Sequence, residues 1–128
     1  MRKRQFKAAL AACEDLLVDH PANANLNAYA GLCHFRLENY ACAKPFLERA
    51  VSLDPSHLDA GIKLAQTYDR LHMSHECAVT AKQFLKLKPS DHTLQGLLDF
   101  HEQNLSLDVE GWESHLYRPA HLRKLSNR

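Results

Sequence analysis

Histidine and cysteine are the residue types of this chain best suited to hold a metal or transfer protons, and the sequence has nine and four of them. His72 and His75 stand three residues apart beside Cys77. However, a zinc site needs about four well-placed ligands, and these residues fall in a turn between two expected helices. His101-Glu102 lacks the second histidine of a helical zinc-protease motif. The sequence therefore predicts no metal and no cofactor.

Motifs for catalysis are equally scarce. The sequence contains no glycine-rich phosphate loop, no nucleophile elbow and no recognisable pair of carboxylates. Its four glycines leave little material for loops that cradle phosphate. We therefore expect a protein that is not an enzyme.

Charge and cysteine spacing narrow the class of partner. Sixteen Lys and Arg against fifteen Asp and Glu give a net charge of +1, so no global field favours nucleic acid or an anionic membrane. Basic residues gather at the two ends, as solvated ends or as a weak contact to phosphate or an acidic peptide: Arg2, Lys3, Arg4, Lys7, Arg118, Arg123, Lys124 and Arg128. No C-x-x-C pair and no apolar run of about 20 residues occurs. We expect a cytoplasmic protein with reduced thiols and no membrane insertion.

One sequence pattern recurs at a fixed spacing along the chain. Pro21, Pro55 and Pro89 stand 34 residues apart, and each ends an apolar-rich stretch, as expected where a helix runs into proline. Small residues lie twelve positions before each proline, and apolar residues lie eight and five positions before it, a helical spacing. Gly31 and Ala65 stand 24 residues before Pro55 and Pro89, which indicates close approach of a partner helix.

This pattern resembles the tetratricopeptide repeat, whose 34-residue unit reads W-x-x-L-G-x-x-Y, then A-x-x-x-F, then P. The matching stretches are Asn27-x-x-Ala30-Gly31-x-x-His34, Ala43-x-x-x-Leu47 and Pro55, followed by Gly61-x-x-Leu64-Ala65-x-x-Tyr68, Cys77-x-x-x-Ala81 and Pro89. The Trp position and the late aromatic are lost in both units. The resemblance implies an all-α fold, a right-handed superhelix of antiparallel helix pairs.

We expect one domain over residues 1–128. Within it, residues 3–21 form the second helix of a partial repeat, 24–57 and 58–91 form two complete repeats, 92–118 form a capping helix or degenerate repeat, and 119–128 form a tail. The first helix of the last, incomplete repeat should span residues 92–105. A further short helix should follow around Trp112 and end at Pro119. Pro45 lies inside an expected helix, where it predicts a kink or a late start near Tyr40 to Ala43.

In proteins that this chain resembles, each repeat is a pair of helices. The first helix of each pair lines a concave groove, where an extended peptide or a partner helix docks. By helical phase, the candidate peptide-binding residues are Asn25, Tyr29, Leu32, Phe35, Arg36, Lys63, Gln66, Arg70, Leu97 and Phe100. Leu32 and Phe35 could equally pack in the core. The three basic residues would suit a partner with carboxylates and apolar anchors. His34 takes the place that Tyr68 has one repeat later, which predicts a packed, hydrogen-bonded core histidine.

The expected function is that of an adaptor or scaffold, a module for protein–protein interaction. Two alternatives stay open: a secretion-type chaperone or co-chaperone that holds an unfolded client, and a self-associating structural fragment of a longer solenoid. Some co-chaperones of this family grip the C-terminal carboxylate of a heat-shock chaperone through Lys and Asn. The positions that match here hold Tyr29, Asp59 and Lys63, of which only Lys63 fits, so that specialised role is not expected.

Residues 3–21 lack a first helix of their own within this sequence. We expect them to expose an apolar edge that contains Phe6, Leu10 and Leu17. Upstream chain or a second copy would cover this edge, so a homo-oligomer is possible.

Overall fold

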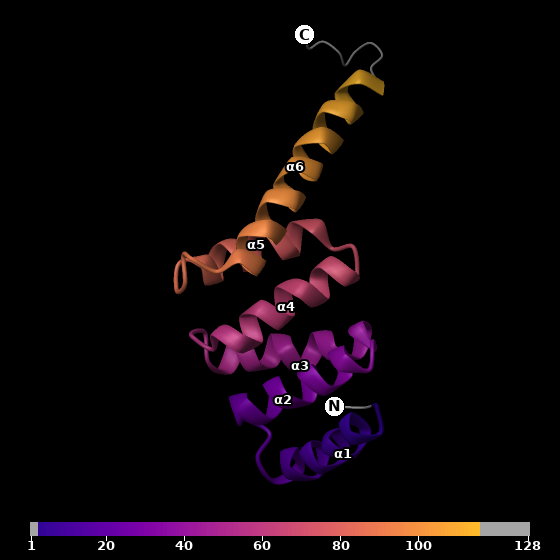
Figure 1. The fold of residues 1–128 in the computed structure, drawn as a ribbon, viewed down its shortest axis with the longest axis vertical. Coiled ribbons are helices and arrows are strands. Elements are labelled where there is room, and N and C mark those ends of the chain that lie inside the picture. The colour runs from indigo at the N-terminus through magenta and orange to yellow at the C-terminus, as the bar shows by residue number, and fades with distance from the viewer. Residues whose placement is uncertain (1–2, 116–128) are drawn as a thin grey trace.

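The computed structural model describes residues 3–115, with side chains described for residues 3–103, and this part of the chain is a stack of α-helices without strands (Figure 1). The expected all-α fold is confirmed. The helices are α1 (Lys3–Asp19), α2 (Ala24–Arg36), α3 (Tyr40–Leu53), α4 (Leu58–Arg70), α5 (Ser74–Leu85) and α6 (His92–His115).

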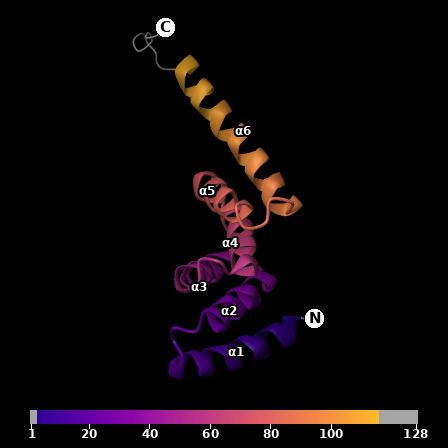
Figure 2. The ribbon, with the colours of Figure 1, turned by 90° about the vertical axis from the view of Figure 1, so that its left-hand side faces the viewer.

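Each helix packs against its neighbours in sequence. In addition, the first helix α4 contacts the first helices on either side of it, α2 and α6. This arrangement forms a layer of first helices, with α3 and α5 packed against it (Figure 2). We call the free side of this layer the first-helix face. Helix α1, at the other end of the stack from α6, packs only against α2 among the described helices.

The helix pairs are joined by matching turns. Glu38 and His72, which stand 34 residues apart, both adopt a left-handed backbone, with φ of 63° and 61°. The next amide donates to a carbonyl five residues back in each case, from Asn39 to His34 at 2.8 Å and from Met73 to Tyr68 at 2.8 Å. This hydrogen bond closes the end of a helix and reverses the chain. Both repeats therefore turn in the same way without a glycine.

The core lies between the two layers. Leu47 on α3, Phe84 on α5 and Leu94 on α6 are its largest apolar side chains with no exposed surface. Phe84 and Leu94 belong to one buried cluster that also includes Leu64 and Tyr68 of α4. The apolar stripes of successive helices therefore merge into one core, as stacked repeats require.

Pro45 stands in the second turn of α3, and the helix continues through it from Tyr40 to Leu53. The start at Tyr40 agrees with the sequence expectation. A proline at this position removes the donor for the carbonyl of Ala41. Because Ala41 and Pro45 are both exposed, water can reach the carbonyl that lacks a donor.

Helix α6 differs from the sequence expectation in its length. It continues to His115 as a single helix, instead of ending near residue 105 before a separate short helix around Trp112. Its far half extends away from the stack (Figure 2). The expected stop at Pro119, the tail 119–128 and the basic cluster from Arg118 onward lie outside the described residues. Within the described part of the chain, no helix combines the length and the apolar character needed to cross a membrane.

Candidate functional site

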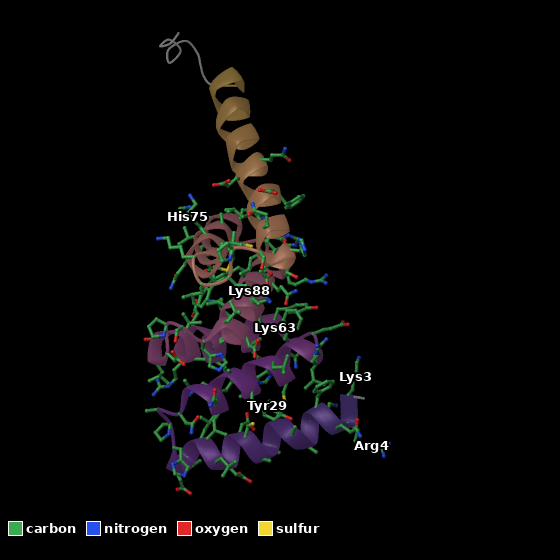
Figure 3. The ribbon with its side chains drawn as sticks, turned by 60° about the vertical axis from the view of Figure 1, so that its left-hand side comes forward. Lys3, Arg4, Tyr29, Lys63, His75 and Lys88 are labelled. Atoms are coloured by element: carbon green, nitrogen blue, oxygen red, sulfur yellow. The ribbon has the colours of Figure 1, made fainter. Side chains whose placement is uncertain are left out.

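Helices α2 and α4 enclose a hollow of about 340 Å³ on the first-helix face. We call it the α2–α4 hollow. It is lined by Asn25, Ala28, Tyr29, Leu32 and Arg36 of α2, Leu47 of α3, and His57, Asp59, Ala60, Ile62 and Lys63 at the start of α4. The hollow combines an apolar floor with a charged rim of two cations and one carboxylate, and Tyr29 and Lys63 are marked in Figure 3.

His57, which lines this hollow, connects the N-terminus of α4 to α2. Its Nδ1 accepts a hydrogen bond from the backbone amide of Ala60 at 3.2 Å and so caps the N-terminus of α4. Because Nδ1 is an acceptor, Nε2 carries the proton and donates to Oδ1 of Asn25 at 2.8 Å. Nδ1 therefore caps α4 and Nε2 ties α4 to α2, which leaves this histidine no free nitrogen for proton transfer.

The surroundings of Lys63 in the α2–α4 hollow lower its pKa. Its ammonium lies 4.9 Å from the centre of the Phe35 ring, a cation–π contact. Partial burial lowers the pKa of Lys63, the positive charge of Arg36 lowers it further, and the charge of Asp59 opposes both effects. Lys63 and Arg36 therefore repel each other above an apolar floor, and an anion placed between them would relieve that repulsion.

An aromatic ladder continues this site along the face. The ring of Phe35 meets the ring of Tyr40 edge to face, with centres 5.2 Å apart. The guanidinium of Arg70 lies 5.9 Å from the centre of the Tyr40 ring. The ladder therefore runs from Lys63 through Phe35 and Tyr40 to Arg70, with a cation at each end.

The far end of the ladder opens into a second hollow of about 590 Å³, the α4–α6 hollow. It is lined by Tyr40, Asp69, Arg70, His72, Ser74, Phe100 and His101. His101 is almost fully buried, and its Nε2 lies 2.7 Å from Oδ1 of Asp69, which ties α6 to α4. Phe100 is 56% exposed and offers an apolar surface to anything that enters.

The structure places the residues that the sequence singled out in several environments. Asn25, Tyr29, Leu32, Arg36 and Lys63 line the α2–α4 hollow, whereas Arg70 and Phe100 line the α4–α6 hollow. Phe35 and Leu97 are partly buried against the core, and Phe35 also contributes to the ladder. Gln66 lines neither hollow and is partly buried, with its Oε1 atom lacking a hydrogen-bond partner.

Sequence reasoning missed Tyr40 and His57 as parts of this face. The sequence places Tyr40 only near the start of the second helix, yet its ring stands between Phe35 and Arg70. His57 directly precedes the expected first helix, a capping position that could have pointed to it. Cys77 is not available to a metal cluster because its buried thiol donates to the carbonyl of Ala65 at 3.2 Å.

His34 is packed as expected but lacks the expected hydrogen bond at one nitrogen. It is 9% exposed and stacks on Phe46 with ring centres 5.4 Å apart, while its Nδ1 atom has no partner. One repeat later, Tyr68 donates its hydroxyl hydrogen to Glu48 at 2.6 Å. Burial lowers the pKa of His34, and the charge of Glu14, which takes the place of Glu48 one repeat earlier, partly opposes this effect.

Comparisons with known proteins agree with this architecture. No protein-family model and no curated protein sequence matches the chain. Among solved structures, the first tetratricopeptide domain of Spaghetti (RPAP3), bound to the HSP90 peptide SRMEEVD, is 22% identical with a TM-score of 0.74, and the match covers 80% of this chain and 81% of that one. The corresponding domain of Arabidopsis OM64 is 17% identical with a TM-score of 0.72, over 79% of this chain and 84% of that one. The MamA structure from MSR-1 is 19% identical with a TM-score of 0.72, over 83% of this chain and 61% of that one.

Proposed function

We propose that this chain, which has the tetratricopeptide-repeat fold, is a protein-interaction module that binds an acidic, extended segment of a partner protein along its first-helix face. The observation that carries this proposal is the pair Arg36 and Lys63, two cations that repel each other across the apolar floor of the α2–α4 hollow. A carboxylate between them would gain from both charges, and an adjacent apolar side chain would fill the floor.

The shape of the face supports an extended ligand. The α2–α4 hollow and the α4–α6 hollow are joined by the ladder from Lys63 to Arg70. A chain lying along this line would meet cations at both ends of the ladder and exposed aromatic surface at Tyr29 and Phe100. Such alternation of charge and aromatic surface is typical of peptide grooves, in which a few anchors carry most of the affinity.

Domains of the same fold bind acidic peptides, namely the HSP90 peptide SRMEEVD in Spaghetti and the HSP70 peptide SGPTIEEVD in the second domain of human RPAP3. Asp59 sets this chain apart from a site built for a terminal carboxylate, because its charge stands on the same rim as Lys63. We therefore propose that the carboxylate recognised here belongs to a side chain within the peptide.

We propose no catalytic role for this face. The two nitrogens of His57 are engaged with Ala60 and Asn25, and the thiol of Cys77 is engaged with Ala65. The role of adaptor or scaffold needs only binding. A cytoplasmic location is part of the proposal, supported by the four cysteines, all of which are free thiols.

An arrayed library of extended peptides tests this function. Peptides that combine Glu or Asp with Leu or Phe should be retained, and the same peptides with Gln and Asn in place of the acids should be lost. Lys63→Glu and Arg36→Glu should each abolish retention, whereas Lys88→Glu, a change at an exposed residue that lines neither hollow, should not. Equal capture of neutral apolar peptides by wild type and Lys63→Glu would instead indicate a chaperone that holds unfolded clients.

A further inference from the structure

Helix α1 has an outward face that nothing in the described part of the chain covers. Leu16 is 50% exposed, although the residues at the same position of the next two repeats, Ala50 and Phe84, have no exposed surface. The difference arises because α3 and α5 each pack against a first helix of their own repeat, whereas α1 contacts only α2. This part of the sequence expectation needs correction: Phe6, Leu10 and Leu17 are half-buried on the same side of α1 as the buried Cys13, and the exposed large apolar residues are Leu16 and Val18.

The exposed residues next to Leu16 form one stripe at helical spacing, which we call the α1 stripe: Arg4, Ala8, Ala12, Asp15, Leu16 and Asp19. Its basic residue lies at the start of the helix, its alanines lie in the middle, and its acidic residues lie at the end. Lys3 and Lys7 add to the basic end, and Figure 3 shows Lys3 and Arg4 projecting from the edge of the molecule there.

This order of charges is unfavourable for a helix on its own. The first turn of α1 has no acidic residue and its last turn has no basic residue. Lys3 and Arg4 instead stand at the positive end of the helix dipole, and Asp19 stands at the negative end. A partner that brings acids to the first end and bases to the second would offset both effects.

We propose that the α1 stripe is a self-association surface on which a second copy of this chain lays its own α1 in antiparallel orientation. A two-fold axis at Ala12 sets each Leu16 opposite the partner copy's Ala8 and brings Arg4 of each copy to the last turn of the other, beside Asp19. The small alanines allow the two helices to approach closely. The surface is isologous because the same stripe serves both copies.

Among the described side chains, the opposite end of the stack offers no equivalent surface. On α6 the positions that correspond to buried residues of α2 and α4 carry Gln95, Asp99 and Glu102, which are all exposed. Gln95 donates to Asp99 at 2.8 Å, and Glu102 pairs with Lys82 at 3.5 Å. Charge and polarity therefore favour pairing of α1 with α1 over head-to-tail growth from α1 to α6.

Sedimentation equilibrium of the 128-residue chain tests this inference. A contact along one helix of about 25 Å is small, so we expect a weak dimer that forms over roughly 10 μM to 1 mM. The variants Lys3→Glu/Arg4→Glu/Lys7→Glu and Asp15→Lys/Asp19→Lys should each be monomeric, because the charges on the α1 stripe and at its basic end then all have one sign. Lys86→Glu/Lys88→Glu, exposed changes beyond the end of α5, should dimerise as wild type does.

Mixing the two charge variants gives the decisive result. Equal amounts of the acidic-helix and the basic-helix chains should restore association as a one-to-one heterodimer, which dimerisation through any other surface would not produce. The acidic substitutions at the start of α1 agree with its dipole, and circular dichroism should show both variants fully helical. A wild-type mass that stays monomeric up to the highest concentration, or variants that dimerise alone as wild type does, would overturn the proposal.

Discussion

Gly61 on α4 faces the ring of Phe84 on α5 so closely that a β-carbon at this position would overlap the ring. In the preceding repeat the close approach lies elsewhere, because a β-carbon on Gly31 would come within 2.6 Å of the Leu47 side chain. Where the second repeat has Gly61 and Phe84, the first has Asn27 and Ala50. Where the first has Gly31 and Leu47, the second has Ala65 and Ala81. Each repeat thus places a large side chain opposite a glycine, but at a different level of the helix pair.

Gly61→Ala should therefore destabilise the protein. The Phe84 ring is fully buried and has little room to move, so we expect a loss of about 1–3 kcal/mol in the free energy of unfolding. Gly96→Ala is the matched control, because a β-carbon there meets nothing within 4 Å. It should stabilise α6 by about 0.5–1 kcal/mol. Urea denaturation followed by circular dichroism measures both changes, and equal effects would disprove the packing argument.

The left-handed residues Glu38 and His72 lead to a second prediction. A side chain with a β-carbon is disfavoured at φ near 60°, and glycine is not. Glu38→Gly and His72→Gly should each stabilise the protein by up to about 1 kcal/mol. Glu38→Val should destabilise it, since a branched side chain fits this backbone poorly. Melting temperatures of the three variants check the prediction, and a lower value for both glycine variants would contradict it.

His34 should make stability depend on pH. Its pKa is lowered in the folded protein from the value of 6.5, chiefly because burial disfavours the charged ring. Below about pH 6.5 the unfolded chain therefore binds more protons at this site than the folded one. Stability should be unaffected by His34 above that pH, should fall as the pH decreases from 6.5 toward the folded pKa, and should level off below it. Urea titrations of wild type and His34→Gln, from about pH 8 to about pH 5, should show a smaller loss in the variant. An identical loss in both proteins would exclude His34 as the cause.

These residues also show what the sequence could and could not predict. The 34-residue period depends on helix length and turn length, and the spacing of Pro21, Pro55 and Pro89 indicates their sum. Gly31 was correctly read as a point of close helix approach, since glycine has little other use inside a helix. The left-handed turns were not foreseen, because Glu38 and His72 are not the residues that usually signal them.

The candidate site depended more on three-dimensional packing. Helical phase placed Arg36 and Lys63 on the same face, and both residues line the α2–α4 hollow. It could not show that Tyr40, from the start of the following helix, would reach between Phe35 and Arg70. Helical phase also could not distinguish Leu16 from Leu17, which are neighbours on α1. Leu17 is half-buried and Leu16 is exposed, because α2 covers only one side of α1.

Asp59 leads to the last prediction, which concerns peptide affinity. Its carboxylate stands on the rim of the α2–α4 hollow near Lys63 and partly offsets the burial and the Arg36 repulsion that lower the pKa of that lysine. An acidic peptide brings its own carboxylate to the same place and must approach Asp59, a like charge. Asp59→Asn should therefore tighten binding of an acidic peptide by roughly threefold to tenfold, mainly through faster association at low salt. Fluorescence anisotropy with a labelled acidic peptide measures this change. The control is Glu76→Gln on the exposed side of α5, which removes one negative charge as Asp59→Asn does. If the two variants bind equally tightly, the peptide responds only to net charge, and the carboxylate site does not lie between Arg36 and Lys63.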